Sequence, residues 1–132
     1  MRLIAAFALA ASLAAPALHA QSPLSVPSAN PAYERNKKSV IAFYDLAFNQ
    51  SKPREAMSKY AGATYTQHNP EVADGKEAFI AYFEKLAVEY PGKSIAFKRV
   101  FADGNYVVVH SEHTFPGMIF GGTWAAMDLF RL

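Results

Sequence analysis

Asp128 is the carboxylic acid whose surroundings in the sequence best suit acid–base chemistry. Side chains alternate between two faces along a strand predicted for residues 123–132, so Asp128 shares its face with Trp124, Ala126 and Phe130. A carboxylate in such an apolar row is either paired or has a raised pKa, and a raised pKa suits a general base. The alternative is a structural Asp bonded to a neighbouring backbone amide or hydroxyl. We take Asp128 as a candidate catalytic residue.

His113 lies in a second predicted strand, residues 106–115, and is the next candidate catalytic residue. The face that carries His113 is the more apolar one, so we expect His113 to point inward and His110 with Glu112 to point outward. The opposite parity would exchange the two histidines. An inward His113 is either catalytic or a buried neutral histidine bonded to a backbone carbonyl.

His68 is the third candidate catalytic residue. It shares a face with Thr66 in a short strand predicted for residues 63–69, directly before Asn69-Pro70, where the chain turns towards a helix. Two histidines and one carboxylate also occur in metal sites, but their spacing here lacks a local signature such as H-E-x-x-H. We therefore expect acid–base or hydrogen-bonding roles rather than a metal site.

Aromatic residues at helical spacing form most of the predicted core, and some of them must line any cavity between helices and sheet. Tyr44 and Trp124 are the better candidates for a cavity wall because each has a polar group that can point inward. The candidate substrate-binding residues are Tyr44, Thr66, Phe79 and Trp124.

The composition excludes several classes of protein. The chain has 132 residues, of which 52% are hydrophobic and 18% charged, and it has no cysteine. It is too apolar for a disordered protein and cannot form disulfides or thiolate metal sites. Its formal charge of +2 gives no electrostatic footprint for nucleic acid.

Residues 1–20 have the layout of a secretory signal peptide: Arg2, an apolar run over 3–13, and small residues up to Ala20. An uncleaved anchor is the alternative, but the run is short against the roughly 20 apolar residues that a spanning helix needs. We expect cleavage, a periplasmic or secreted protein and no membrane attachment afterwards. Residues 21–31 read as a flexible, proline-rich leader, and residues 32–132 as one domain.

The order of the expected elements indicates an α+β fold. Helices are predicted over 32–48 and 53–59, and a third helix begins with the cap-like Asp74-Gly75-Lys76-Glu77 and stops at Pro91-Gly92. Strands over 95–101, 106–115 and 123–132 follow, and Asp103-Gly104 marks a hairpin. We expect N-terminal helices packed over a strongly curved antiparallel sheet.

Four segments together resemble the SnoaL-like polyketide cyclase group of the nuclear transport factor two superfamily, over about residues 33–132. They are Tyr65-Thr66-Gln67-His68-Asn69-Pro70, Ala73-Asp74-Gly75-Lys76-Glu77, Asp103-Gly104-Asn105-Tyr106-Val107-Val108-Val109-His110 and Met127-Asp128-Leu129-Phe130-Arg131. The resemblance implies a cone-shaped half-barrel, with His68 and Asp128 in its cavity. It further implies no cofactor, and homodimers formed through the outer face of the sheet.

In the cyclases of this group, the general base resembles an Asp on one further strand, in a His-Trp-Asp-like segment. That segment would lie beyond Leu132, so we expect a C-terminally truncated sequence or a degenerate member in which Asp128 serves as base.

Two functions remain open. One is an exported enzyme of cyclase, isomerase or lyase type acting on a small, mostly apolar carbonyl compound. The other is a non-catalytic module that binds a small hydrophobic ligand or dimerises through the same fold.

Overall fold

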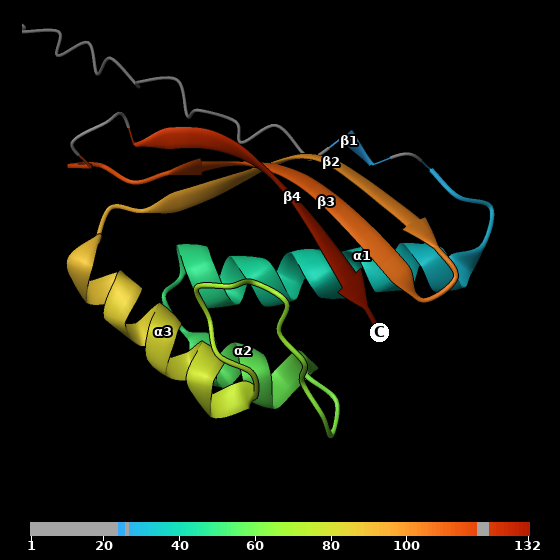
Figure 1. Ribbon diagram of the computed structural model, residues 1–132. Coiled ribbons are helices and arrows are strands. Elements are labelled where there is room, and N and C mark those ends of the chain that lie inside the picture. Colours follow the sequence, from blue (N-terminus) through green and yellow to red (C-terminus); the bar gives the residue numbers. More distant parts are fainter. Residues whose placement is uncertain (1–23, 26, 119–121) are drawn as a thin grey trace, which may run out of the picture.

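The computed structural model describes residues 24–25, 27–118 and 122–132. Three helices and a mixed sheet form an α+β fold, and the predicted architecture is confirmed (Figure 1). The predicted signal peptide, residues 1–20, lies outside the described residues. Within those residues, no helix is both long and apolar enough to cross a membrane. The elements are β1 (Leu24–Ser25), α1 (Pro31–Tyr44), the π-helical turn η1 (Asp45–Asn49), α2 (Pro53–Tyr60), α3 (Lys76–Glu89), β2 (Ser94–Asp103), β3 (Tyr106–Thr114) and β4 (Thr123–Arg131).

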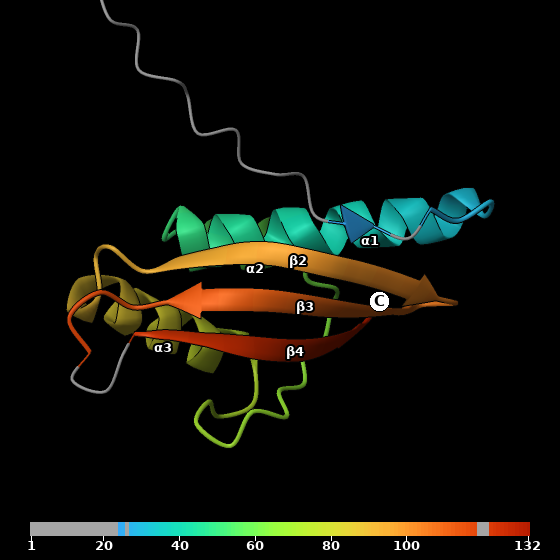
Figure 2. The ribbon, with the colours of Figure 1, turned by 90° about the horizontal axis from the view of Figure 1, so that it is seen from above.

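The sheet has the order β1-β2-β3-β4, and the three long strands are antiparallel. α1 contacts β2 and β3 from one side of the sheet, and Figure 2 shows it running along the β2 side. β1 pairs in parallel with β2 through Leu24 and Arg99, a pairing that the proline-rich composition did not predict. A bulge between Phe97 and Arg99 interrupts the β2–β3 register. Such bulges bend and twist a strand, which favours the curvature that brings the sheet over the helices.

The first helix begins as its sequence requires but ends differently from the prediction. The Asn30 side chain accepts a hydrogen bond from the Ala32 amide at 2.9 Å, and Pro31 occupies the first turn. After Tyr44 the chain continues as η1, in which the Gln50 amide bonds to the Asp45 carbonyl at 3.0 Å. The wider π turn leaves three consecutive side chains, Leu46, Ala47 and Phe48, all buried.

Asn49 ties the end of this helix to the sheet. Its Nδ2 donates to the Ile95 carbonyl at 3.1 Å, and its Oδ1 accepts from the Ile95 amide at 2.6 Å. The side-chain amide thus satisfies both backbone groups of a residue at the start of β2. This double hydrogen bond places η1, and with it Phe48, against the inner face of the sheet.

The inner face of the sheet follows the predicted alternation. Along β3 every second side chain is buried, and Val107, Val109 and Ser111 are fully so. The expected parity is therefore confirmed: His113 points inward, and His110 lies on the outer face. A larger cluster joins this face to the helices through Phe43, Phe48, Phe79, Phe83 and Phe115.

The strand predicted for residues 63–69 is wrong, because the segment is irregular and pairs with no strand of the described sheet. Side chains satisfy its backbone amides instead. The Gln67 amide donates to Asp74 Oδ1 at 2.6 Å, and the His68 and Asn69 amides donate to Gln67 Oε1 at 3.0 and 3.1 Å. Polar side chains that bond to nearby backbone compete with a strand ladder in this way.

The hairpin between β2 and β3 turns at Gly104, as predicted from Asp103-Gly104. Asp103 pairs with Tyr106, and Gly104 has a φ of 57°, the left-handed region that L-residues avoid. We expect Gly104→Ala to lower the free energy of unfolding by about 1–2 kcal/mol, measured by urea denaturation. Gly62→Ala is the matched control, since neither glycine has an atom within 4 Å of an added Cβ and Gly62 has no positive φ. Equal stability losses in both variants would contradict this account.

Candidate functional site

Asp128 lies on the inner face of β4, opposite the fully buried Val109 of β3. Its side chain is half-buried, and its Oδ2 accepts a hydrogen bond from the Tyr44 hydroxyl at 3.4 Å. Burial raises the pKa of Asp128 above its ordinary value, and the Tyr44 hydrogen bond partly opposes that rise. Burial and then the charge of Asp128 raise the pKa of Tyr44, so this phenol remains a proton donor. The pair combines a poorly solvated carboxyl group with a fixed hydroxyl.

His113 lies two inner-face positions away, where it pairs with Trp124 of β4. It is 8% exposed, and its Nε2 is 3.1 Å from Ser111 Oγ. Burial lowers its pKa, so the imidazole is neutral at neutral pH. Its ring lies 5.2 Å from Phe48 and 6.1 Å from Tyr44, centroid to centroid. His113 therefore offers a neutral hydrogen-bonding group within an aromatic cluster.

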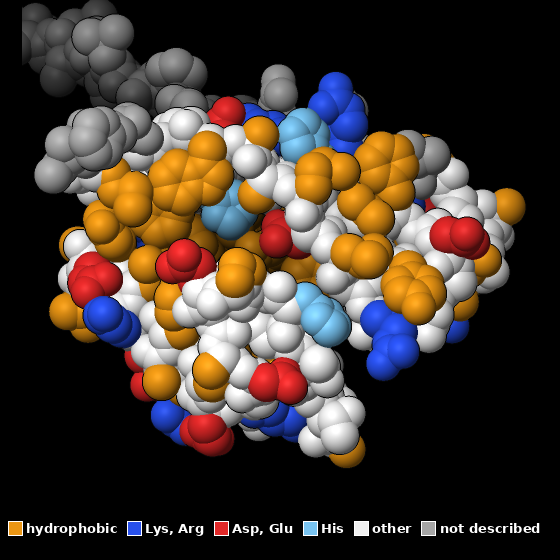
Figure 3. Space-filling view, in the orientation of Figure 1, with side chains coloured by type: hydrophobic (Ala, Val, Ile, Leu, Met, Phe, Trp, Pro, Cys, Tyr) orange, Lys and Arg blue, Asp and Glu red, His pale blue; other side chains and the backbone are white. Residues whose placement is uncertain are grey.

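Aromatic rings surround these polar groups. Trp124 stacks on Phe115 at 4.9 Å and lies almost parallel to His113 at 6.5 Å, while 41% of its surface stays exposed. Phe130 packs against Tyr44 at 5.6 Å. Figure 3 shows this face of the molecule hollowed near its centre, with hydrophobic side chains in the hollow and acidic and histidine side chains beside it.

Tyr65, in the loop between α2 and α3, packs against the same core cluster as Phe130 of β4, and that cluster contains Tyr44. The Tyr65 ring packs edge-on against Phe79 at 5.4 Å, and its hydroxyl accepts a hydrogen bond from Gln67 Nε2 at 3.0 Å. Burial, followed by the charges of Asp74 and Asp128, raises the pKa of Tyr65 to about 12. Tyr65 and Tyr44 thus both lie within electrostatic reach of the same carboxyl group.

The structure brings together only part of the predicted site. Asp128, Tyr44, His113 and Trp124 are joined by the hydrogen bond and ring contacts above, and Phe79 is a core residue that backs Tyr65. Thr66 and His68 are exposed in the irregular loop. Among the described residues, no hydrogen bond, ion pair or ring contact joins either of them to Asp128 or His113. Their roles stay predictions.

Tyr65 and Gln67 are the functional candidates that sequence reasoning missed. Strand alternation assigned them to the face opposite Thr66 and His68, and the candidate residues were taken from the face of Thr66 and His68. The structure leaves Tyr65 and Gln67 half-buried and the other two exposed. The sequence signal for these two residues was Asp74, which lies seven residues after Gln67. Its carboxylate organises the loop by accepting a hydrogen bond from the Gln67 amide.

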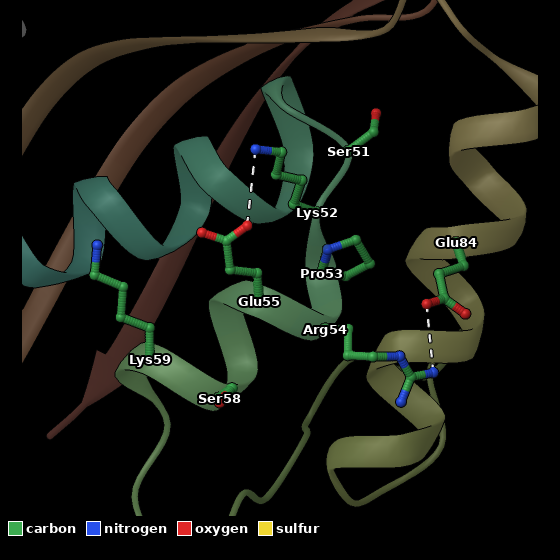
Figure 4. Close-up of a pocket in the computed structure, with 8 residues that line it drawn as sticks. All are labelled: Ser51, Lys52, Pro53, Arg54, Glu55, Ser58, Lys59 and Glu84. Carbon is green, nitrogen blue, oxygen red and sulfur yellow. Dashed lines mark ion pairs between the residues drawn. The ribbon is translucent and has the colours of Figure 1, made fainter.

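No group of three or more His, Cys, Asp or Glu side chains among the described residues is arranged to hold a metal ion. A separate groove of about 530 Å³ lies along α2 and is shown in Figure 4. Its charges are exposed and largely paired, with Arg54 3.4 Å from Glu84 and Lys52 3.7 Å from Glu55. It contains no desolvated acid or base, so the inner face of the sheet is the better candidate site.

Three solved structures share this architecture at low sequence identity. "Putative polyketide cyclase" from Bacillus cereus ATCC 10987 has a TM-score of 0.69 and 13% identity, covering 87% of this chain and 80% of its own. "Putative SnoaL-like polyketide cyclase" from Jannaschia sp. CCS1 has a TM-score of 0.62 and 20% identity, covering 81% and 83%. TsrD from Streptomyces laurentii has a TM-score of 0.60 and 19% identity, covering 80% and 82%. These likenesses show the fold.

No curated protein matches the chain significantly. The sequence profile of the SnoaL-like domain, in contrast, matches residues 40–132, which is most of the chain and includes α2, α3 and the three long strands. The chain therefore belongs to the SnoaL-like domain family, as its sequence motifs had indicated.

Proposed function

We propose that this protein binds a small, mostly apolar carbonyl compound in the hollow beneath the sheet and uses Asp128 to remove a proton beside the carbonyl group. The observation that carries the proposal is the setting of Asp128: a half-buried carboxyl group, hydrogen-bonded to Tyr44, beside aromatic rings. Family membership and the two neighbours named as polyketide cyclases support this class of chemistry.

The reaction needs a base, a partner for the developing charge and shelter from water. The Asp128 carboxylate would take the proton from carbon, and the electron pair left behind would form an enolate whose charge lies on the carbonyl oxygen. The enolate could then be reprotonated elsewhere or attack a second carbonyl carbon. The raised pKa of Asp128 makes the carboxylate a stronger base than an exposed Asp.

A non-catalytic binding module is the alternative. The exposed Trp124 face and the neutral His113 would suit a hydrophobic ligand with one polar group equally well. The two functions share a binding site and differ in whether a proton moves.

A coloured proton-transfer probe tests the proposal without the natural substrate. Abstraction of the ring C–H proton of 5-nitrobenzisoxazole breaks the N–O bond and releases a nitrophenolate. We expect saturable turnover whose rate rises with pH through the pKa of Asp128, above the ordinary value of 3.8. His113, with its pKa below the ordinary 6.5, should add no step in the neutral range. A rate no greater than that of free acetate at equal concentration would refute the proposal.

We also propose that the outer face of the sheet pairs two copies of this chain, as the family resemblance implies. Phe101, Val108 and Leu129 are register neighbours across three strands, and Met127 and Leu129 are each 67% exposed. One cation and one anion, the Lys98–Glu112 ion pair, lie on two of the same strands, so a two-fold related copy presents charges of both signs.

The oligomeric state tests this pairing. We expect a dimer by light scattering and a monomer after Met127→Lys with Leu129→Lys, because buried ammonium groups are costly without partners. Val88→Lys, at an 82% exposed position of α3, is the control that should stay dimeric. A monomeric unmodified protein would exclude the interface.

A further inference from the structure

The orientation of the Gln67 amide is determined by its hydrogen bonds. Its Oε1 faces two backbone donors, the amides of His68 and Asn69, at 3.0 and 3.1 Å. An NH₂ group cannot accept from them, so the oxygen must lie on this side and Nε2 on the other. Nε2 therefore donates to the Tyr65 hydroxyl, 3.0 Å away.

This geometry decides what the Tyr65 hydroxyl can do. Its oxygen accepts from Gln67, so its own proton points elsewhere. No acceptor for that proton occurs among the hydrogen bonds of the described residues. Gln67 holds the Tyr65 hydroxyl through this hydrogen bond, and Phe79 holds the Tyr65 ring by edge-on packing.

The two tyrosines near Asp128 consequently have different tasks. The Tyr44 hydroxyl donates its one proton to the hydrogen bond with Asp128 Oδ2, so it has none left for a substrate. The Tyr65 proton remains available, on a half-buried side chain that packs against the same core cluster as Phe130, and the charge of Asp128 helps to raise the pKa of Tyr65. With a pKa of about 12, Tyr65 stays protonated at neutral pH.

We propose that Tyr65 donates the hydrogen bond that receives the substrate's carbonyl oxygen as negative charge develops on it, and that Gln67 is the positioning residue that directs this proton. The inference rests on the function proposed above and adds the oxyanion donor to it. Preorganised donors of this kind act on the transition state more than on the bound substrate.

Two variants test the inference with the same 5-nitrobenzisoxazole probe, whose leaving oxygen gains charge. Tyr65→Phe removes the donor, and we expect kcat to fall about 10²-fold with little change in KM. Gln67→Glu is the sharper variant. One carboxylate oxygen can still accept from the His68 and Asn69 amides, but the other now accepts a hydrogen bond from the Tyr65 hydroxyl and so turns that hydroxyl away from the substrate. We expect Gln67→Glu to match the kcat loss of Tyr65→Phe, and the double variant to lose no more.

The control is Tyr33→Phe, which deletes an exposed hydroxyl bonded to Asp103 at 3.3 Å and should leave kcat unchanged. If the unmodified protein turns over the probe while Tyr65→Phe and Gln67→Glu both keep its kcat, the inference is wrong and the proposed function stands. If the unmodified protein lacks turnover, the proposed function fails. Calorimetric affinity for 4-nitrophenol then decides the donor role: a roughly tenfold weaker Kd for both variants supports it, and unchanged affinity overturns it.

Discussion

Replacing Asp128 with Asn is expected to reduce kcat for 5-nitrobenzisoxazole by about 10²–10⁴-fold, the usual contribution of a general base. The amide has nearly the same shape and can still accept from the Tyr44 hydroxyl, so the site should keep its geometry. What it loses is the ability to take a proton. Asp103→Asn, at the exposed hairpin turn, is the matched control and should keep its activity. Unchanged turnover in Asp128→Asn would exclude Asp128 as the base.

The same substitution has an expected effect on stability. Because the folded pKa of Asp128 is raised, the native state holds its proton more tightly than the unfolded chain does. The stability that this proton confers is complete below the ordinary value of 3.8 and is lost as pH rises through the folded pKa. The Asp128→Asn variant does not titrate at this position, so its stability does not fall as the pH rises through the folded pKa of Asp128. The variant should therefore melt at a higher temperature than the unmodified protein at neutral pH, and the difference should shrink at acid pH.

Replacing Phe48 with Ala is expected to cost about 3–5 kcal/mol of unfolding free energy, the largest stability effect that we anticipate. The side chain is 2% exposed and belongs to a core cluster that contains residues of the helices together with Ile95 and Phe115. Its ring lies within 6.2 Å of the rings of Tyr44, Phe83, His113 and Phe115, centroid to centroid. Truncation leaves a cavity between layers that cannot collapse onto each other.

Thermal and urea unfolding would measure that cost. A loss of 3–5 kcal/mol corresponds to a melting temperature lower by about 10 °C or more for a domain of this size. Val88→Ala, on the exposed side of α3, should stay within about 0.5 kcal/mol of the unmodified protein. A Phe48→Ala variant as stable as Val88→Ala would mean that Phe48 does not connect the layers.

The sequence predicted the sheet well because local rules act strongly there. Alternation along residues 106–115 separated His113 from His110 correctly, and Asp103-Gly104 placed the hairpin. The same alternation put Asp128 in the inner row of β4. Each of these patterns depends on neighbours one or two residues away, which the sequence displays directly.

Where the sequence failed, side-chain hydrogen bonds that strand parity does not reveal decided the local structure. Residues 63–69 have the residue types of a strand, but Asp74 and the Gln67 side chain capture the amides that a ladder would use. The π turn after Tyr44 depends on Asn49 docking onto Ile95, 46 residues later. Tyr65 and Gln67 were missed for the same reason, since their inward position follows from the loop and not from strand parity.

Hydrogen exchange of 2-tetralone in D₂O is the most direct test of the central claim, that Asp128 removes a proton from carbon beside a carbonyl group. NMR would follow loss of the α-hydrogens, and quenching of Trp124, the only tryptophan in the chain, would report binding beside His113. We predict that the unmodified protein binds 2-tetralone and accelerates exchange, and that Asp128→Asn binds it equally without acceleration. Quenching without accelerated exchange in the unmodified protein would contradict the account and identify a binding module.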